Sequence, residues 1–214
     1  CQGRTVQAGT GEGEKQEGKM IKEFFKDWRV WVVIIAVAAW FLLFGCEKPK
    51  TTTYVCKAGQ HDFKPSPVPF PFGAKTMTGW ARLDSSCHYN DLGEDDLDWN
   101  KLAGVYRWAD GYKNVNSFIV AWRPDPIRNT FQLCLYENIA GANRPHESAI
   151  FKVRAGEGFT FWLQESSGFY ALWINGTYID DQDNGRPFGT VGKVSAWFGG
   201  NRTAPHDMSL EMNF

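Results

Sequence analysis

The sequence has no block of basic residues, and its net charge is −1 at pH 7. Nucleic-acid binding needs a positively charged surface, so no nucleic acid is expected among the partners. No Cys-x-x-Cys pair occurs, so a zinc ribbon is not supported. Downstream of Thr76 no stretch sustains a helical period of apolar residues, which argues against a helical domain there.

Aromatic residues are abundant instead. They make up 15% of the 214 residues and include 10 Trp, more than packing alone usually needs. Either a large aromatic core or an aromatic binding surface would use them. Without its N-terminal region, the chain is long enough for one domain of ordinary size.

A hydrophobic run from Val30 to Phe44 follows a segment that carries Lys22, Lys26 and Arg29. A basic start, an apolar middle and a small residue before the cut are typical of a secretory signal peptide. The alternative is an uncleaved membrane anchor. The run is short for that role, because a spanning helix needs about 20 apolar residues.

The end of this run, Leu43-Phe44-Gly45-Cys46, resembles the lipobox of bacterial lipoproteins. The resemblance implies cleavage before Cys46, a diacylglycerol on its thiol and an acylated new N-terminus. Two or three acyl chains hold a protein stably on a membrane. Glu47 differs from the Asp that often retains such proteins at the inner membrane, so the resemblance favours the outer membrane or the cell surface.

These signals divide the chain into four parts. Residues 1–19 are polar and Gly-rich, and are either disordered or upstream of the native start. Residues 20–45 are the predicted signal peptide, with its hydrophobic helix, and residues 46–75 are a predicted Pro-rich tether. The Pro-rich run either acts as a semi-rigid spacer or lies on the domain as a strand-like arm. The domain itself is predicted at residues 76–214.

Three cysteines follow Cys46, namely Cys56, Cys87 and Cys134. An exported compartment permits disulfides, and three thiols allow one bridge in three pairings. Cys56 and Cys87 lie in irregular segments, so we favour that pair. Cys134 lies within an apolar strand pattern and is expected to be a buried thiol.

From Thr76 onward apolar and polar residues alternate. The alternating segments are residues 117–123, 130–137, 159–165, 168–175 and 208–214, separated by clusters rich in Gly, Pro, Asn and Asp. Half-buried antiparallel strands produce this pattern. The sequence therefore predicts an all-β antiparallel sandwich or barrel.

Within this region the run Phe159 to Tyr178, with Asn175-Gly176 at its turn, resembles a hairpin of concanavalin-like and laminin-G-like β-sandwiches. The segment Val194 to Met208, with its Phe198-Gly199-Gly200 turn, resembles their penultimate strand. The region is also similar to uncharacterised secreted bacterial proteins. The resemblance implies a jelly-roll β-sandwich of two curved sheets, in a family that mostly binds or cleaves polysaccharide.

In the predicted strands, the positions that alternate with the core-facing residues carry aromatic and polar side chains. Such side chains stack on sugar rings and bond hydroxyl groups, unless both sheet faces are covered. The loop between the last two strands adds polar groups, which serve either binding or turn formation. The candidate ligand-binding residues are Arg123, Tyr136, Trp162, Gln164, Trp197, Asn201, Arg202 and His206.

Two catalytic motifs known from such folds are incomplete. The Glu-x-Asp-x-x-Glu strand of glucanases has Trp99 where its second Glu is required, and the Gln-x-His of alginate lyases does not occur. We therefore predict a membrane-anchored lipoprotein that binds carbohydrate without catalysis. The alternatives are a polysaccharide lyase or glycoside hydrolase with a non-standard site, and a structural or protein-binding surface module.

The acidic segment from Asp91 to Asn100 concentrates oxygen ligands of the kind that Ca²⁺ prefers. Its spacing does not fit an EF-hand loop, and a solvated acidic loop is the other interpretation. The calcium candidates are Asp95, Asp96 and Asp98. No other cofactor is expected, and the sequence names no protein partner.

Overall fold

The computed structural model describes residues 50–66, 73, 76–125, 128–183 and 187–213. The predicted signal peptide at residues 20–45, the predicted lipidation site Cys46 and residues 1–19 lie outside the described residues. In the part of the chain that is described, no helix combines the length and the apolar character needed to cross a membrane.

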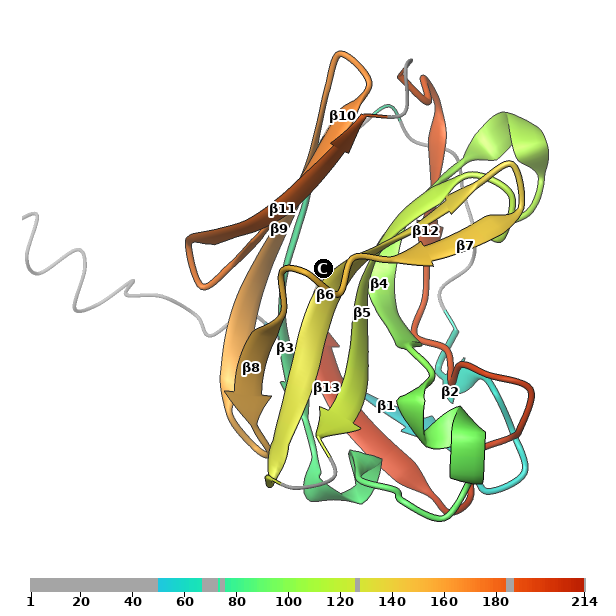
Figure 1. Ribbon diagram of the computed structural model, residues 1–214, viewed down its shortest axis with the longest axis vertical. Helices are drawn as coiled ribbons and strands as arrows, with labels where there is room; N and C mark the ends of the chain where they lie inside the picture. Colours follow the sequence, from blue (N-terminus) through green and yellow to red (C-terminus); the bar gives the residue numbers. More distant parts are fainter. Residues whose placement is uncertain (1–49, 67–72, 74–75, 126–127, 184–186, 214) are drawn as a thin grey trace, which may run out of the picture. The chain divides into compact units, whose positions relative to one another are not determined.

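The described strands form two antiparallel sheets (Figure 1). The first has the order β11-β10-β9-β3-β13-β1-β2. Its strands are β1 (Thr52–Cys56), β2 (Phe63–Lys64), β3 (Thr76–Leu83), β9 (Gly158–Ser166), β10 (Phe169–Ile174), β11 (Thr177–Asp183) and β13 (Met208–Asn213).

The second sheet has the order β12-β4-β5-β6-β7, and β8 also pairs with β6. Its strands are β4 (Asn100–Arg107), β5 (Ser117–Asp125), β6 (Thr130–Ile139), β7 (Ala142–Pro145), β8 (Phe151–Arg154) and β12 (Val191–Val194). The described 3₁₀ turns are η1 (Ser85–Cys87), η2 (Gly93–Leu97) and η3 (Trp108–Asp110). The predicted fold class, an all-β antiparallel jelly-roll sandwich, is confirmed.

The main core lies between the two sheets, and the alternation of the strands creates it. On β9, Phe161 and Leu163 point inward and are fully buried, whereas Trp162 between them is 40% exposed. From the second sheet, Phe118 of β5 stacks on Tyr170 of β10 with ring centroids 3.9 Å apart. Each such buried side chain contributes roughly 1.5–3 kcal/mol of transfer free energy.

The central strands of the second sheet, β4, β5 and β6, are largely buried on both faces. The face of this sheet away from the main core carries a smaller apolar cluster, which consists of Trp99, Tyr106, Ile119, Ala121, Cys134, Tyr136 and Val194. Consequently β5 has almost no solvent-exposed face, although the sequence pattern predicts a half-buried strand. Loops that cover this second face shape the functional site described below.

The sandwich begins earlier than the sequence pattern predicts. β1 pairs with β13 from Thr52↔Met212 to Cys56↔Met208, and β2 pairs with β1. Phe63 of β2 is fully buried. These strands lie within the predicted tether at residues 46–75, so the sandwich includes strands upstream of its predicted start at residue 76. The Thr-Thr-Tyr-Val sequence of β1 is strongly strand-forming, because it is rich in β-branched and aromatic residues.

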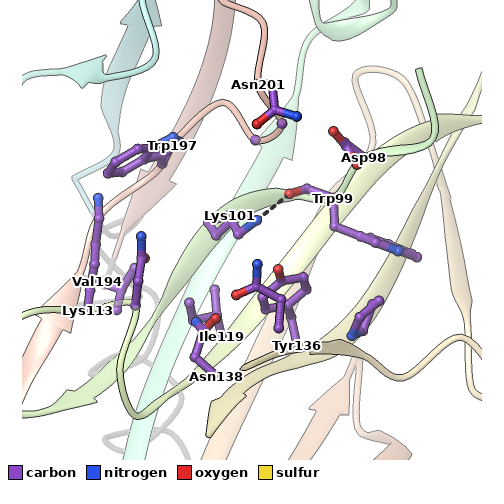
Figure 2. A pocket seen from close by; sticks show the side chains of 15 residues that line it. Asp98, Trp99, Lys101, Lys113, Ile119, Tyr136, Asn138, Val194, Trp197 and Asn201 are labelled. Atoms are coloured by element: carbon purple, nitrogen blue, oxygen red, sulfur yellow. Dashed lines mark hydrogen bonds between the residues drawn. The ribbon is translucent and has the colours of Figure 1, made fainter. Parts of the chain in front are cut away.

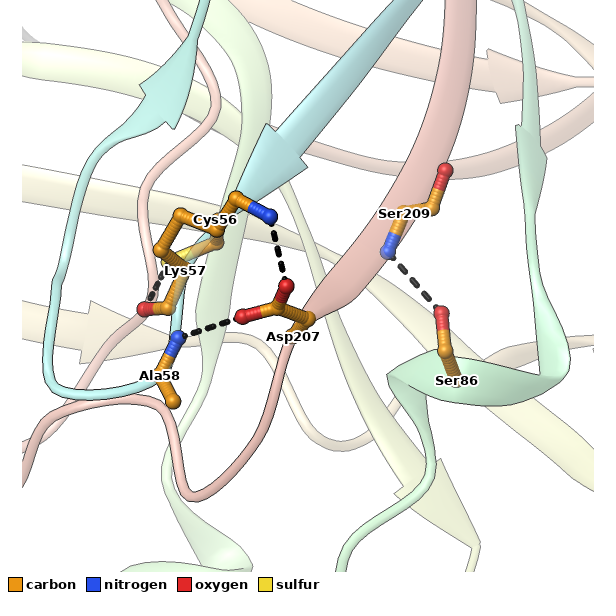
Figure 3. A network of polar contacts seen from close by, with 6 residues as sticks. All are labelled: Cys56, Lys57, Ala58, Ser86, Asp207 and Ser209. Carbon is orange, nitrogen blue, oxygen red and sulfur yellow. Dashed lines mark hydrogen bonds and ion pairs between the residues drawn. The ribbon is translucent and has the colours of Figure 1, made fainter.

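Polar contacts hold the two ends of the described chain together (Figure 3). The carboxylate of Asp207 accepts hydrogen bonds from Nζ of Lys57 at 2.6 Å and from the backbone N–H of Ala58 at 3.0 Å. Next to it, Oγ of Ser86 accepts a bond from the N–H of Ser209 at 2.9 Å. The turn after β1 and the turn η1 are thus both fixed to the start of β13.

The predicted disulfide between Cys56 and Cys87 is wrong, because both residues are free thiols in this structure. Sγ of Cys56 donates to the carbonyl oxygen of Gln60 at 3.4 Å, and Sγ of Cys87 donates to that of Ser209 at 3.2 Å. Burial raises the pKa of the Cys56 thiol to about 11, which leaves little reactive thiolate at neutral pH. Cys134 is a buried free thiol, as predicted.

Candidate functional site

A pocket of about 410 Å³ opens on the face of the second sheet that lies away from the main core (Figure 2). Strands supply one part of its lining and loops supply the rest. The lining residues are Asp98, Trp99, Lys101, Lys113, Asn114, Ile119, Tyr136, Asn138, Asn143, Pro145, Val194, Trp197, Gly199, Gly200 and Asn201.

The strands place one row of side chains in the pocket. Ile119 of β5 lies directly opposite Tyr136 of β6 in the antiparallel register. Asn138 follows Tyr136 on the same face, since residues two apart in a strand point the same way. Asn138 is 2% exposed, and its Nδ2 donates to Oγ of Ser117 at 2.7 Å, which fixes the orientation of the amide.

The loop that carries Trp197 is clamped to the start of β4. The backbone groups of Trp197 and Lys101 exchange two hydrogen bonds, both 2.9 Å long. The side chain of Asn100 is fully buried; its Oδ1 accepts from the N–H of Gly199 at 2.7 Å, and its Nδ2 donates to Oη of Tyr89 at 2.8 Å. Asn100 therefore fixes the position of the loop that carries Trp197 relative to the second sheet.

Two glycines allow this close approach. A Cβ at Gly199 would lie 2.2 Å from the carbonyl oxygen of Trp99, a backbone atom that cannot move aside easily. Gly200 has a φ of +77°, and a Cβ there would lie 2.5 Å from Oδ2 of Asp98. The Phe-Gly-Gly turn is thus required by the packing of the loop against residues 98–100, as well as by backbone conformation.

Two lysine ammonium groups lie in the pocket against aromatic rings. Nζ of Lys113 lies 3.4 Å from the centroid of the Trp197 ring. Nζ of Lys101 lies 4.2 Å from the centroid of the Tyr136 ring and donates to the carbonyl oxygen of Trp99 at 2.7 Å. Both contacts have the geometry of cation–π interactions.

Burial changes the proton affinity of these groups. It lowers the pKa of Lys101 to about 8, against a smaller opposing effect of Asp98. Burial also lowers the pKa of Lys113 to about 8, and the charge of Lys101 adds to this effect. Burial raises the pKa of Tyr136 to about 12, so its phenol stays protonated at neutral pH.

Asp98 is the one carboxylate among the described residues that line the pocket. Burial and the neighbouring Asp95 raise its pKa. Glycoside hydrolysis ordinarily uses two carboxylates that flank the scissile bond. The described lining supplies only one, so its geometry does not match a two-carboxylate hydrolase.

Three of the predicted ligand-binding residues line this pocket: Tyr136, Trp197 and Asn201. Arg123 does not line the pocket but packs against Trp99, which does. Cζ of its guanidinium lies 4.3 Å from the centroid of the Trp99 ring, and its Nη1 lies 2.9 Å from Oε1 of Glu147. The structure thus brings together residues from β6 and from the loop after β12, which lie about sixty positions apart in the sequence.

The other predicted residues lie elsewhere. Arg202 points to Asp95 at 3.5 Å, and His206 contacts the carbonyl oxygen of Ser86 through Nε2 at 2.7 Å; neither lines the pocket. Trp162 and Gln164 belong to β9, on the outer face of the other sheet. There Trp162 stacks on Trp173 with ring centroids 4.7 Å apart.

The sequence pattern did not single out Lys101, Lys113, Asn138 and Asn143. Asn138 lies two residues after Tyr136 and therefore on the same face of the strand, so the alternation in the sequence could have identified it. Lys113 lies in the turn between η3 and β5, where no periodicity exists to predict its direction. Its place in the pocket follows only from the folded loop.

The three calcium candidates have separate roles. Asp95 faces Arg202, the carboxylate of Asp96 accepts from the N–H of Leu92 at 3.0 Å, and Asp98 lines the pocket. Among the described residues, no three or more His, Cys, Asp or Glu side chains are arranged to hold a metal ion.

Fold and site together define an all-β sandwich with an aromatic, amide-rich pocket on the outer face of one sheet. No protein-family model matches the sequence, and no curated protein matches it. Alginate lyase AlyC3 is a similar solved structure, with 7% identity and a TM-score of 0.48 over 78% of this chain and 74% of that chain.

Two further solved structures have comparable similarity. The GH16 protein of the Bacteroides ovatus mixed linkage glucan PUL, solved with a product, has 8% identity and a TM-score of 0.47 over 78% of this chain and 80% of its own. A prokaryotic β-1,3-1,4-glucanase (lichenase) derived from a mouse hindgut metagenome has 8% identity and a TM-score of 0.45 over 76% and 77%. At these identities the likeness concerns the fold alone.

Proposed function

We propose that this protein binds carbohydrate in the pocket without catalysis. The observation that carries the proposal is the composition of the lining. Aromatic rings lie beside four amide side chains, those of Asn114, Asn138, Asn143 and Asn201. Amides both donate and accept hydrogen bonds, as sugar hydroxyls do, and aromatic rings pack against the apolar faces of sugar rings.

The pocket has a size and rigidity that suit this role. Its volume of about 410 Å³ lies within the range of roughly 300–1,000 Å³ that is usual for small-ligand sites. The strands hold Tyr136 and Asn138, and Asn100 holds the loop that carries Trp197 and Asn201. A preformed site of this kind loses little conformational entropy when a ligand binds.

Export and membrane attachment complete the proposal. The basic and apolar segment at residues 20–45 and the lipobox-like Leu43-Phe44-Gly45-Cys46 support a lipoprotein that is acylated at Cys46. In that arrangement the lipid anchor holds the pocket at the outer membrane or the cell surface of a bacterium, where glycans are accessible.

One observation favours a second candidate, a polysaccharide lyase. The ammonium of Lys101, with a pKa of about 8, lies over the phenol ring of Tyr136. A deprotonated Lys101 amine would take the proton next to a uronate carboxyl group, and the Tyr136 phenol would protonate the departing glycosidic oxygen as the bond breaks. Incubation of polyuronates with the protein and measurement of ultraviolet absorbance from unsaturated ends tests this candidate; an increase would replace the non-catalytic proposal.

The binding proposal is tested with two tryptophan variants. Trp197→Ala should weaken binding to glycans retained on an array at least about tenfold, because truncation of a central Trp commonly costs 2 kcal/mol or more. Trp162→Ala is the matched control, since Trp162 lies on the other sheet, and it should bind as the wild type does. Loss of binding in Trp162→Ala alone would move the site to the outer face of the first sheet.

A further inference from the structure

The lysines give the described pocket lining a net positive charge. Lys101 and Lys113 are its basic residues and Asp98 is its acidic one, so the lining carries one excess positive charge when both amines are protonated. Both ammonium groups lie inside the pocket, over Tyr136 and Trp197. Lysines that only pack their aliphatic stems usually extend the charged group into water.

Neither ammonium is neutralised at close range within the described structure. Among the described residues, the Lys101 ammonium donates to the carbonyl oxygen of Trp99, and the Lys113 ammonium lies on the ring of Trp197. Asp98 and Asp62 act on them only through longer-range attraction. An ammonium has three N–H donors, so each lysine retains donors for a bound group.

We propose that the ligand of this pocket is an acidic sugar, whose carboxylate or sulfate is bound by Lys101 and Lys113 while the neighbouring amides bind its hydroxyl groups. This inference rests on the proposed function and narrows it to anionic glycans. An oxyanion beside either ammonium group would make charge-assisted hydrogen bonds, which are about twice as strong as neutral ones.

The electrostatics of the pocket lysines agree with this assignment. Burial lowers the pKa of both lysines to about 8, which means that the positive charges are destabilised by partial loss of water. A bound anion restores a favourable partner and raises both pKa values again. A negatively charged ligand therefore offsets the free-energy cost of burying the two ammonium groups, which is already present in the free protein.

Two matched pairs of polymers test the inference with the purified protein. The first pair is polygalacturonate and its carboxyl-reduced form, and the second is dextran sulfate and dextran. We expect at least about tenfold tighter binding to a charged polymer than to its neutral counterpart, and weaker binding as ionic strength rises, because salt screens such interactions. The first pair reports on carboxylate recognition and the second on sulfate recognition.

The outcomes separate this inference from the proposed function. Equal binding to the charged and neutral members of both pairs would overturn the acidic-sugar inference and leave carbohydrate binding in place. Binding to a neutral glycan on an array, with none to either charged polymer, would do the same. Absence of binding to every glycan would overturn both.

Lysine variants localise the effect. Lys113→Met and Lys101→Met should each weaken binding to the preferred charged polymer by about tenfold or more, because each removes a charged hydrogen bond. Lys113→Arg should retain most of the affinity. Lys64→Met is the matched control, since Lys64 lies on β2 outside the pocket with a side chain that is 66% exposed.

Thermal unfolding shows whether each variant remains folded. Lys113 is in a turn, so its substitution by Met tests the inference even when Lys101→Met unfolds. Unchanged affinity of folded Lys113→Met for the charged polymer would overturn the inference. An equal loss of affinity in Lys113→Met and Lys64→Met would assign the attraction to general surface charge and would overturn it as well.

Discussion

The ammonium of Lys113 lies on the ring of Trp197, so a single residue contact joins the charged and the aromatic parts of the pocket. In the proposed complex Trp197 would offer apolar surface to a sugar, and Lys113 would offer positive charge beside it. The two functions are therefore difficult to separate by deleting Trp197, whereas a change at Lys113 removes the charge and leaves the ring in place. This is why the lysine variants are the sharper test of ligand charge.

The pH dependence of binding follows from these residues. The amines bind an anion in their protonated form, and their pKa in the free protein is about 8. Affinity for an acidic polymer should thus be constant between pH 6 and 7 and fall as pH rises from 8 to 9.5. Because at most two amines lose a proton, the logarithm of the affinity should fall by at most two per pH unit. Binding titrations across this range, at constant ionic strength, measure the change.

An arginine variant supplies the control. The guanidinium stays charged throughout this range, so Lys113→Arg should lose less affinity at pH 9.5 than the wild type. A pH profile of Lys113→Arg that overlays the wild type would show that Lys113 does not cause the fall.

The sequence predicted some of the individual side chains that line the pocket, but not all of them. Tyr136 was singled out because strand alternation places it opposite the core-facing Leu133 and Leu135. The same argument selected Trp162, whose side chain does point outward, but alternation carries no information about which sheet a strand joins. The direction of Lys113 depends on a loop and has no counterpart in any sequence period.

Among the elements, the loop from Val194 to Asn201 depends most on a single buried contact. Asn100 bonds both the N–H of Gly199 and the phenol of Tyr89. Asn100→Ala should lower the free energy of unfolding by about 1–3 kcal/mol, because it leaves buried polar groups without partners. Denaturant unfolding measures this change.

Asn201→Ala serves as its control, because Asn201 is the same residue type and lies in the loop that Asn100 holds, but its side chain is exposed. Its stability should lie within about 0.5 kcal/mol of the wild type, as is usual for surface positions. Equal loss of stability in both variants would contradict the clamp assigned to Asn100.

The elements that the sequence predicted best are those with clean alternation. The predicted strands at residues 117–123 and 130–137 correspond to β5 and β6. β1 was not predicted, because the nearby Pro-rich run led to the prediction of a tether. β11 extends to Asp183, into an Asp-rich cluster that was predicted to separate two strands. Its acidic side chains suit the outermost strand of the sheet, where charge discourages pairing with another chain.

For the molecule as a whole, the sequence predicts a lipid anchor at Cys46. Cys46→Ser should abolish incorporation of labelled fatty acid and shift the protein out of the membrane-bound lipoprotein fraction, because acylation requires the thiol. Cys56→Ser is the control, since Cys56 is buried in β1, and it should keep the label. Metabolic labelling followed by membrane fractionation distinguishes the two, and label that persists in Cys46→Ser would exclude this anchor.

The pairing of β1 with β13 sets a limit on how far such an anchor reaches. Thr52, the first residue of β1, lies six positions after Cys46 in the sequence. A fully extended chain covers at most about 3.6 Å per residue, so this connection spans roughly 22 Å at most. An acylated Cys46 would thus confine the sandwich to a thin layer above the lipid, where it meets polymers that lie against the cell or have already been drawn to its surface.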